Sequence, residues 1–170
     1  MPTRKLIALG FLAVLTLPAC DGGTTPTAVN PTPAPTPTPT PAAVESTIAV
    51  PSADVPKEVA NNSTTTSVTN VTVDGTVLDL TVPVSISHTW RGDLDVKLRH
   101  PDGTTVNLFI GDPRDARDDV IETFTVGNAP DLQRLLGKRS GGVWTLMAID
   151  TQFQDKGTLL SWSLNLRIRQ

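Results

Sequence analysis

Hydrophobic and polar residues alternate along several short stretches of this chain. In the longest stretch, Leu78, Leu80, Val82, Val84 and Ile86 alternate with polar residues or proline. This period of two is typical of a β-strand with one buried face. Further stretches of similar character are residues 46–50, 68–73, 94–98, 105–110, 143–150 and 158–166.

Turn-forming residues separate these stretches. Pro101-Asp102-Gly103 combines a fixed φ, a side chain that bonds its own backbone and a residue that adopts positive φ. Asp74-Gly75 is typical of a β-hairpin turn, and the polar segment 57–66 is expected to be a loop. Short alternating strands with frequent turns predict an all-β, antiparallel sandwich or barrel.

Two details refine this prediction. Pro83 cannot donate to a β-ladder, so it indicates an edge strand or a bulge. The stretch 46–50, which ends at Pro51, is expected to be an edge strand. A single helical turn is predicted at 130–136, closed by Gly137.

The N-terminal residues have the pattern of a secretory signal. Arg4 and Lys5 precede 12 apolar residues, Leu6 to Leu17. A bilayer-spanning helix needs about 20 residues, so a signal peptide is the better interpretation. Leu17-Pro18-Ala19-Cys20 resembles a bacterial lipobox. That resemblance implies cleavage before Cys20 and lipid on this cysteine; the alternative is a plain signal peptide with an incidental cysteine.

A segment rich in Pro and Thr follows the cysteine. Alternating prolines between residues 24 and 43 favour an extended, disordered polyproline II stalk without a core. At about 3.1 Å per residue it would reach up to about 60 Å. We therefore expect a lipoprotein signal peptide (1–19), a tether (20–45) and a β-sandwich domain (46–170). The expected location is the cell envelope, extracytoplasmic and lipid-anchored, facing the periplasm or the cell surface.

Composition excludes some classes of function. The net charge is −3 and basic residues are dispersed among acidic ones, so no basic stripe for nucleic acid exists. The single cysteine excludes an internal disulfide and a multi-cysteine metal site.

A series of motifs occurs in one order along the predicted domain: His88-Thr89-Trp90-Arg91-Gly92-Asp93-Leu94, then Gly142-x-Trp144-x-Leu146, then Asp150, then Gly157-x-Leu159-x-x-Trp162-x-Leu164-x-Leu166. From about Ser46 to Ile168 the chain resembles the P domain (P/Homo B domain) of kexin- and furin-like proprotein convertases. The resemblance implies a galactose-binding-like jelly roll that assists a subtilisin-like serine protease and performs no chemistry. It also implies structural roles for His88, Arg91, Gly92, Asp93, Leu94, Trp144, Asp150, Gly157 and Trp162.

Catalysis by this chain is not expected, and no catalytic residue is assigned. A protease triad needs a nucleophile, a base and an orienting acid, and the chain has only two histidines, His88 and His100. No segment resembles a subtilisin-type nucleophile motif. We expect His88 to be hydrogen-bonded near a turn.

No cofactor is required, but two groups of carboxylates could provide oxygen ligands for Ca²⁺. One group combines Asp93, Asp150 and Asp155. The alternative is the loop that contains Asp112, Asp115, Asp118 and Asp119. A solvated loop is the simpler interpretation there, because Arg114 and Arg117 lie within it.

Three functions remain open. The first is a non-catalytic, membrane-anchored module that binds or stabilises a protein partner, most naturally a subtilisin-like protease. The second is a glycan- or cell-wall-binding jelly roll, in which an exposed Trp90 would contact the ligand. The third is a protein assigned serine-type endopeptidase activity through its family.

Overall fold

A computed structural model describes residues 42–170 of this protein. The predicted signal peptide, Cys20 and most of the predicted tether lie outside these residues. Within them the two helical segments, η1 (Arg91–Asp93) and η2 (Pro130–Leu135), are short 3₁₀ turns. Neither is long enough to cross a membrane.

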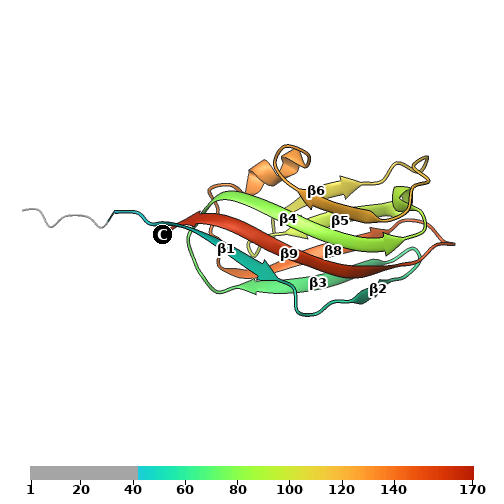
Figure 1. The fold of residues 1–170 in the computed structure, drawn as a ribbon, viewed down its shortest axis with the longest axis horizontal. Coiled ribbons are helices and arrows are strands. Elements are labelled where there is room, and N and C mark those ends of the chain that lie inside the picture. Colours follow the sequence, from blue (N-terminus) through green and yellow to red (C-terminus); the bar gives the residue numbers. More distant parts are fainter. Residues whose placement is uncertain (1–41) are drawn as a thin grey trace, which may run out of the picture. The chain divides into compact units, whose positions relative to one another are not determined.

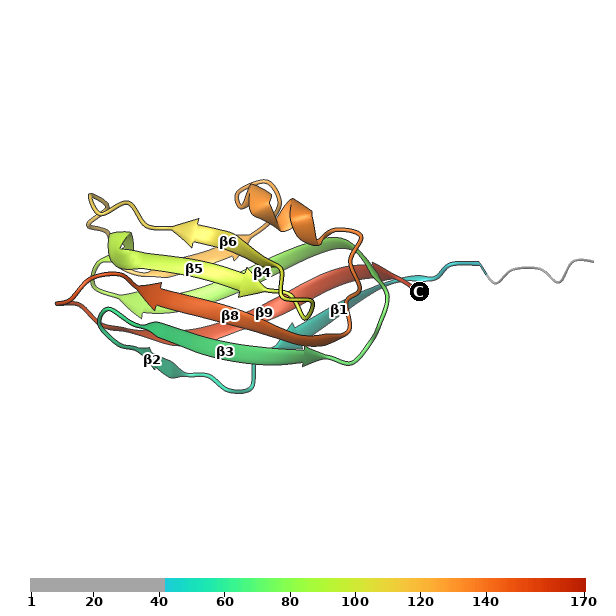
Figure 2. The same cartoon turned by 180° about the vertical axis from the view of Figure 1, so that it is seen from behind.

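The described chain folds into two antiparallel β-sheets packed face to face (Figure 1). The first sheet has the order β1 (Glu45–Pro51), β9 (Gly157–Arg169), β4 (Thr76–His88), β7 (Val120–Phe124), and β2 (Lys57–Val59) also pairs with β9. The second has the order β3 (Thr64–Val71), β8 (Gly142–Asp150), β5 (Leu94–Arg99), β6 (Thr105–Ile110), seen from behind in Figure 2. The antiparallel all-β prediction is confirmed, and the jelly-roll subclass stays a prediction.

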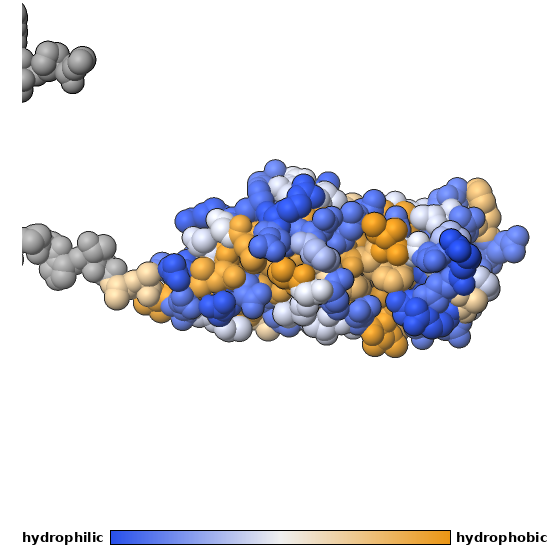
Figure 3. All heavy atoms as spheres, turned by 90° about the horizontal axis from the view of Figure 1, so that it is seen from above, coloured by the Kyte–Doolittle hydropathy of each residue, from blue (hydrophilic) through white to orange (hydrophobic). Residues whose placement is uncertain are grey.

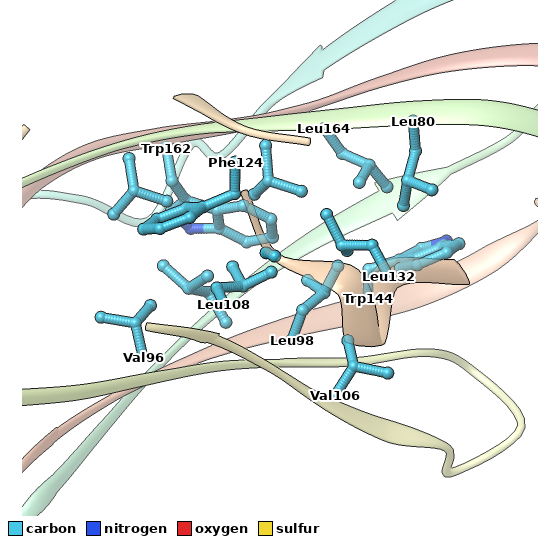
Figure 4. Close-up of a cluster of buried hydrophobic side chains, with 14 of the residues drawn as sticks. Leu80, Val96, Leu98, Val106, Leu108, Phe124, Leu132, Trp144, Trp162 and Leu164 are labelled. Atoms are coloured by element: carbon cyan, nitrogen blue, oxygen red, sulfur yellow. The ribbon is translucent and has the colours of Figure 1, made fainter. Parts of the chain in front are cut away.

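Alternating side chains from both sheets form one core. Leu94, Val96 and Leu98 on β5 are fully buried, as their alternation predicts. Trp144 on β8 and Trp162 on β9 are also buried, and Figure 4 shows them among leucine and valine side chains between the layers. Burial of alternating apolar side chains is the main stabilising contribution in such a sandwich.

The two buried tryptophans also make hydrogen bonds. The indole Nε1–H of Trp162 donates to Ser67 Oγ on β3 at 2.6 Å, which connects one sheet to the other. The indole of Trp144 donates to the carbonyl of Ser140 at 2.9 Å. Buried indole N–H groups require such partners, so these two residues combine packing with specific orientation.

The structure differs from the pattern-based expectations on β4. This strand lies between β9 and β7, so Pro83 does not lie on an edge strand. It is not at a bulge either: the pairing with β9 is interrupted between Thr81 and Val84, without a change of register. A register shift does occur near Leu78, and it turns Val77 rather than Leu78 fully inward.

Two connections were also predicted incorrectly. Asp74-Gly75 does not close a hairpin, because β3 and β4 belong to different sheets. Instead the backbone of Gly75 bonds to Ser140, in the segment that precedes β8. The polar segment 57–66 contains the short strand β2, which tertiary pairing with β9 induces. By contrast, the turn at 101–103 joins β5 to β6 in a hairpin as expected.

Replacing Leu164 by Ala should lower the free energy of unfolding by about 2–5 kcal/mol, because Leu164 is fully buried and its removal leaves a cavity. Urea denaturation of the variant measures this loss. Leu160→Ala on the same strand is the matched control, because Leu160 is 46% exposed and should lose less than about 1 kcal/mol. Equal losses would show that β9 does not face the core as described.

Candidate functional site

The loops at one end of the sandwich gather most of the candidate site residues. The β4–β9 ladder has Thr76 opposite Arg169 at one end and His88 opposite Gly157 at the other. The first end holds both ends of the described chain, where Val44 pairs with Gln170. The opposite end is built from residues 88–93, 111–119 and 151–157 (Figure 1), and we call it the loop end.

Arg91, Gly92 and Asp93 form η1, a corner fixed by the 111–119 loop. The backbone N–H of Arg91 donates to the carbonyl of Arg117, and that of Gly92 to the carbonyl of Asp115. The Arg91 guanidinium lies 4.8 Å from the centroid of the Phe109 ring and 3.4 Å from a carboxylate oxygen of Asp115. These contacts pack the tripeptide against the 111–119 loop, and the structural role that the resemblance implies for it stays a prediction.

Gly92 is required by the close approach of two backbones. A Cβ atom at this position would overlap the carbonyl oxygen of Asp112. Gly157 meets a similar limit, because a Cβ there would overlap the carbonyl of Ser87 and the ring of His88. Both glycines allow a strand end and a loop to pack in direct contact.

His88 connects the two sheets at the loop end. Its Nε2 lies 3.3 Å from Asp150 Oδ2, and both side chains are completely buried. Its Nδ1 lies 3.1 Å from the amide nitrogen of Trp90 and 2.9 Å from the carbonyl oxygen of that residue. With a proton on Nε2 for Asp150, Nδ1 accepts from the Trp90 N–H. His88 is thus hydrogen-bonded near a turn, as predicted.

His100 lies at the opposite end of β5 and is also structural. Its Nε2 is 2.8 Å from the carbonyl of Arg139, and its Nδ1 accepts from the N–H of Asp102. Its ring packs edge-on against Trp144. Within residues 42–170, neither histidine contacts a serine hydroxyl, so the described residues do not assemble a serine–histidine pair.

Asp93 differs from the other carboxylates of the loop end. It is only 8% exposed, and its carboxylate receives no hydrogen bond or ion pair from the residues that the structure describes. Burial raises the pKa of Asp93, and the nearby charges of Asp150 and Asp155 raise it further, while His88 opposes them. Its backbone carbonyl accepts two bonds from Thr151.

Asp93 and Asp155 line a cavity of about 540 Å³ at the loop end. Trp90, which is partly buried, and the exposed Phe153 also line it. Pattern analysis identified Asp93, Asp155 and Trp90 but missed Phe153. An aromatic residue between two glutamines in a polar loop is the signal that could have indicated it.

The calcium assignments stay predictions. No group of three or more His, Cys, Asp or Glu residues in the described range is arranged to hold a metal ion. Asp150 Oδ1 accepts the N–H of Gln152 and Oδ2 faces His88, so both oxygens already have partners. The carboxylates of Asp93, Asp150 and Asp155 are close enough to interact electrostatically but do not form a ready set of ligands.

The acidic loop at 111–119 is largely compensated by arginine and backbone groups. Asp115 pairs with Arg117 at 2.6 Å, and Asp112 accepts the N–H of Arg114. Asp119 adopts positive φ and accepts the backbone N–H of His88 at 2.8 Å. Asp118 is exposed. These contacts favour a structural loop over a metal loop.

Replacing Gly92 by Ala should destabilise the fold by about 3 kcal/mol or more, because either η1 or the Asp112 backbone must move. Gly127→Ala is the matched control, because a Cβ there meets only the Thr125 hydroxyl, at 3.4 Å. Thermal melting of both variants compares them. Equal stability of the Gly92 and Gly127 variants would contradict the close packing of η1 against the loop.

Acid should weaken the loop end through Asp115. The hydrogen bond from Arg117 lowers the pKa of Asp115 from 3.8 to about 2. A lowered pKa means that the pairing stabilises the fold above about pH 4 and is lost as the pH falls towards 2. Melting temperatures measured from pH 6 to pH 2 should therefore fall less steeply for Asp115→Asn than for the original chain. Asp118→Asn, which changes an exposed neighbour, should keep the original slope; identical slopes for all three would contradict this role.

Several curated proteins are similar to part of this chain. The chain is 40% identical over 83 residues to leupeptin-inactivating enzyme 1 of Streptomyces exfoliatus, covering 49% of this chain and 17% of that protein. It is 38% identical over 85 residues to a transglutaminase-activating metalloprotease of Streptomyces mobaraensis, covering 50% and 10%. The matched segment thus spans less than a fifth of either relative.

Solved structures show a related fold. A serine protease of Aeromonas sobria aligns with a TM-score of 0.53 at 21% identity, over 77% of this chain and 28% of that one. The same protease in complex with its chaperone aligns with a TM-score of 0.55 at 21% identity, over 78% and 28%. At this identity the likeness concerns the fold alone.

A family model adds the decisive match. The model of the proprotein convertase P-domain matches residues 77–166, which is more than half of the chain and includes β4 through most of β9. These residues contain the His88 motif, η1, both buried tryptophans and the loop end. The protein therefore belongs to the proprotein convertase P-domain family.

Proposed function

We propose that this chain is a non-catalytic P-domain module that binds and stabilises a protease outside the cytoplasm. The observation that carries the proposal is the pattern of the matches. About half of this chain matches larger proteins, of which one is named an enzyme that inactivates leupeptin and the other a metalloprotease; the matched segment is only 17% and 10% of these two Streptomyces relatives. The shared part is the P domain.

The chemistry of the described residues supports binding rather than catalysis. The ring nitrogens of both histidines face backbone groups or Asp150 instead of a hydroxyl nucleophile. The loop end, in contrast, exposes a cavity with charged and aromatic walls. A rigid sandwich that presents loops at one end is a common platform for recognition.

The partner in this proposal is a subtilisin-like serine protease. The Aeromonas serine protease contains a region with the same fold, which supports that choice. The Streptomyces mobaraensis relative is named a metalloprotease, so the family also accompanies another class of protease. The binding experiment below therefore identifies the class of the partner directly. No comparable observation favours a glycan ligand.

Membrane attachment and calcium complete the proposal. Lipid on Cys20 and the tether 20–45 would hold the domain at the cell envelope, on the outer side of a membrane. Proteins of Trichormus variabilis and of a Nostoc species, 32% and 34% identical over 92 residues, are named calcium-dependent proteases. Calcium is therefore the cofactor to vary when partner binding is measured.

The purified full-length chain should hydrolyse neither casein nor fluorogenic peptides and should not react with a fluorophosphonate probe. The partner that the chain captures from an envelope extract, identified by mass spectrometry, should be a protease. Adding the chain should lengthen the half-life of that protease at elevated temperature. Gly127→Ala, a tolerated substitution outside the loop end, is the control that should keep this effect. Hydrolysis by the chain alone, or no effect on any captured protease, would contradict the proposal.

A further inference from the structure

The cavity at the loop end lies where three loops meet. Its walls come from Trp90 and Asp93 at one side, Pro113 of the 111–119 loop, and residues 152–155 of the turn before β9. Its volume of about 540 Å³ lies within the usual range for binding sites. We call it the acidic–aromatic pocket.

Asp93 is an unpartnered charge directed into this pocket. The residue as a whole is only 8% exposed and it lines the pocket, yet no donor from the described residues bonds to its carboxylate. Other carboxylates of the sandwich are compensated: Asp102 pairs with Lys138 at 2.6 Å and Asp54 with Lys57 at 2.7 Å. A buried carboxylate without a partner is unfavourable, so a ligand that brings a positive charge would relieve this cost.

The remaining walls suit a flat cation. Asp155 accepts only one hydrogen bond, from the hydroxyl of Thr89 at 2.6 Å. The indole N–H of Trp90 donates to the carbonyl of Pro113 at 3.2 Å, which fixes the ring at the pocket edge. Phe153 is 69% exposed on the opposite turn. Two carboxylates beside aromatic faces match the hydrogen-bonding and stacking preferences of a guanidinium group.

Basic side chains of the same end are engaged elsewhere. Arg91 lies over Phe109 and beside Asp115, and Lys156 is 3.8 Å from Glu58. No described lysine or arginine forms an ion pair with Asp93 or Asp155. Within residues 42–170 the pocket therefore has no positive charge of its own.

We propose that the acidic–aromatic pocket binds an arginine side chain on the surface of a partner protein. This proposal rests on the proposed function, in which the module binds a protein, and it names the group that is recognised. Asp93 and Asp155 accept the guanidinium N–H groups, and Trp90 and Phe153 cover its faces. The residues that line the pocket belong to the loop end, and Val44 and Gln170 pair at the opposite end. In Figure 1 the C-terminus lies at the end of the ribbon away from these loops.

A calcium ion fits this pocket less well than a guanidinium. Ca²⁺ requires six to eight oxygen ligands. Among the described carboxylates near the pocket, Asp93 is without partners, whereas each oxygen of Asp150 already has one and Asp155 is bonded to Thr89. The rings of Trp90 and Phe153 provide no oxygen ligand for the metal.

The test uses the ¹⁵N-labelled full-length chain and the capped peptide Ac-Gly-Gly-Arg-Gly-Gly-amide. The analogue with citrulline keeps the shape of arginine but removes its charge. The arginine peptide should shift the Trp90 indole resonance and bind about tenfold more tightly than the citrulline peptide, the ratio expected for one charged hydrogen bond. Asp93→Asn and Phe153→Ala should each weaken binding about tenfold, whereas Asp112→Asn, on the neighbouring loop, should leave it unchanged.

Equal binding of both peptides, or full binding by the Asp93→Asn variant while its melting temperature shows that it is folded, would overturn the inference. So would CaCl₂ or a cell-wall oligosaccharide that shifts the Trp90 indole when the arginine peptide does not. If the chain captures a protease but does not bind the arginine peptide, the proposed function stands and only this inference is wrong. If the chain binds the arginine peptide but captures no protease, this inference stands and the proposed function is wrong.

Discussion

The contact between His88 and Asp150 determines how the loop end is arranged. The two side chains come from different sheets, β4 and β8, and meet where both are fully buried. The His88 ring also holds the backbone of Trp90, while Asp150 accepts the N–H of Gln152 at the start of the next turn. One buried pair therefore positions both walls of the acidic–aromatic pocket. Removing either partner would leave a buried polar group uncompensated, which is strongly unfavourable.

The candidate site and the ends of the described chain lie at opposite ends of the sandwich. The described chain begins and ends at one end of the β4–β9 ladder, and the loops of the candidate site lie at the other. The outer surface between them is mixed: in the view of Figure 3, hydrophobic side chains emerge in separate patches among hydrophilic ones. The exposed hydrophobic residues Ile121 and Leu160 lie on strands of the first sheet, away from the pocket.

The sequence predicts the parts of the fold that depend on local pattern. Alternation identifies the buried faces of β4 and β5, and the ordered motifs identify the family. It cannot show that the chain changes sheets after Asp74, because the bonds between Gly75 and Ser140 join residues far apart in the sequence. Nor can it place the bulge at Leu78, which depends on pairing with β9. Of the residues that line the pocket, the sequence indicated Asp93 and Asp155 as carboxylates for Ca²⁺ and Trp90 as a contact residue. That Phe153 lies beside them is shown by the three-dimensional arrangement of the loops.

The central claim is that the loop end, rather than an outer sheet face, contacts the partner. Hydrogen–deuterium exchange of the full-length chain, alone and with the protease that it captures, tests this most directly. The account predicts slower exchange in residues 89–93 and 151–156, with β1 unchanged. Protection confined to β1 or to the exposed side of β9, with unchanged exchange in both loops, would contradict it.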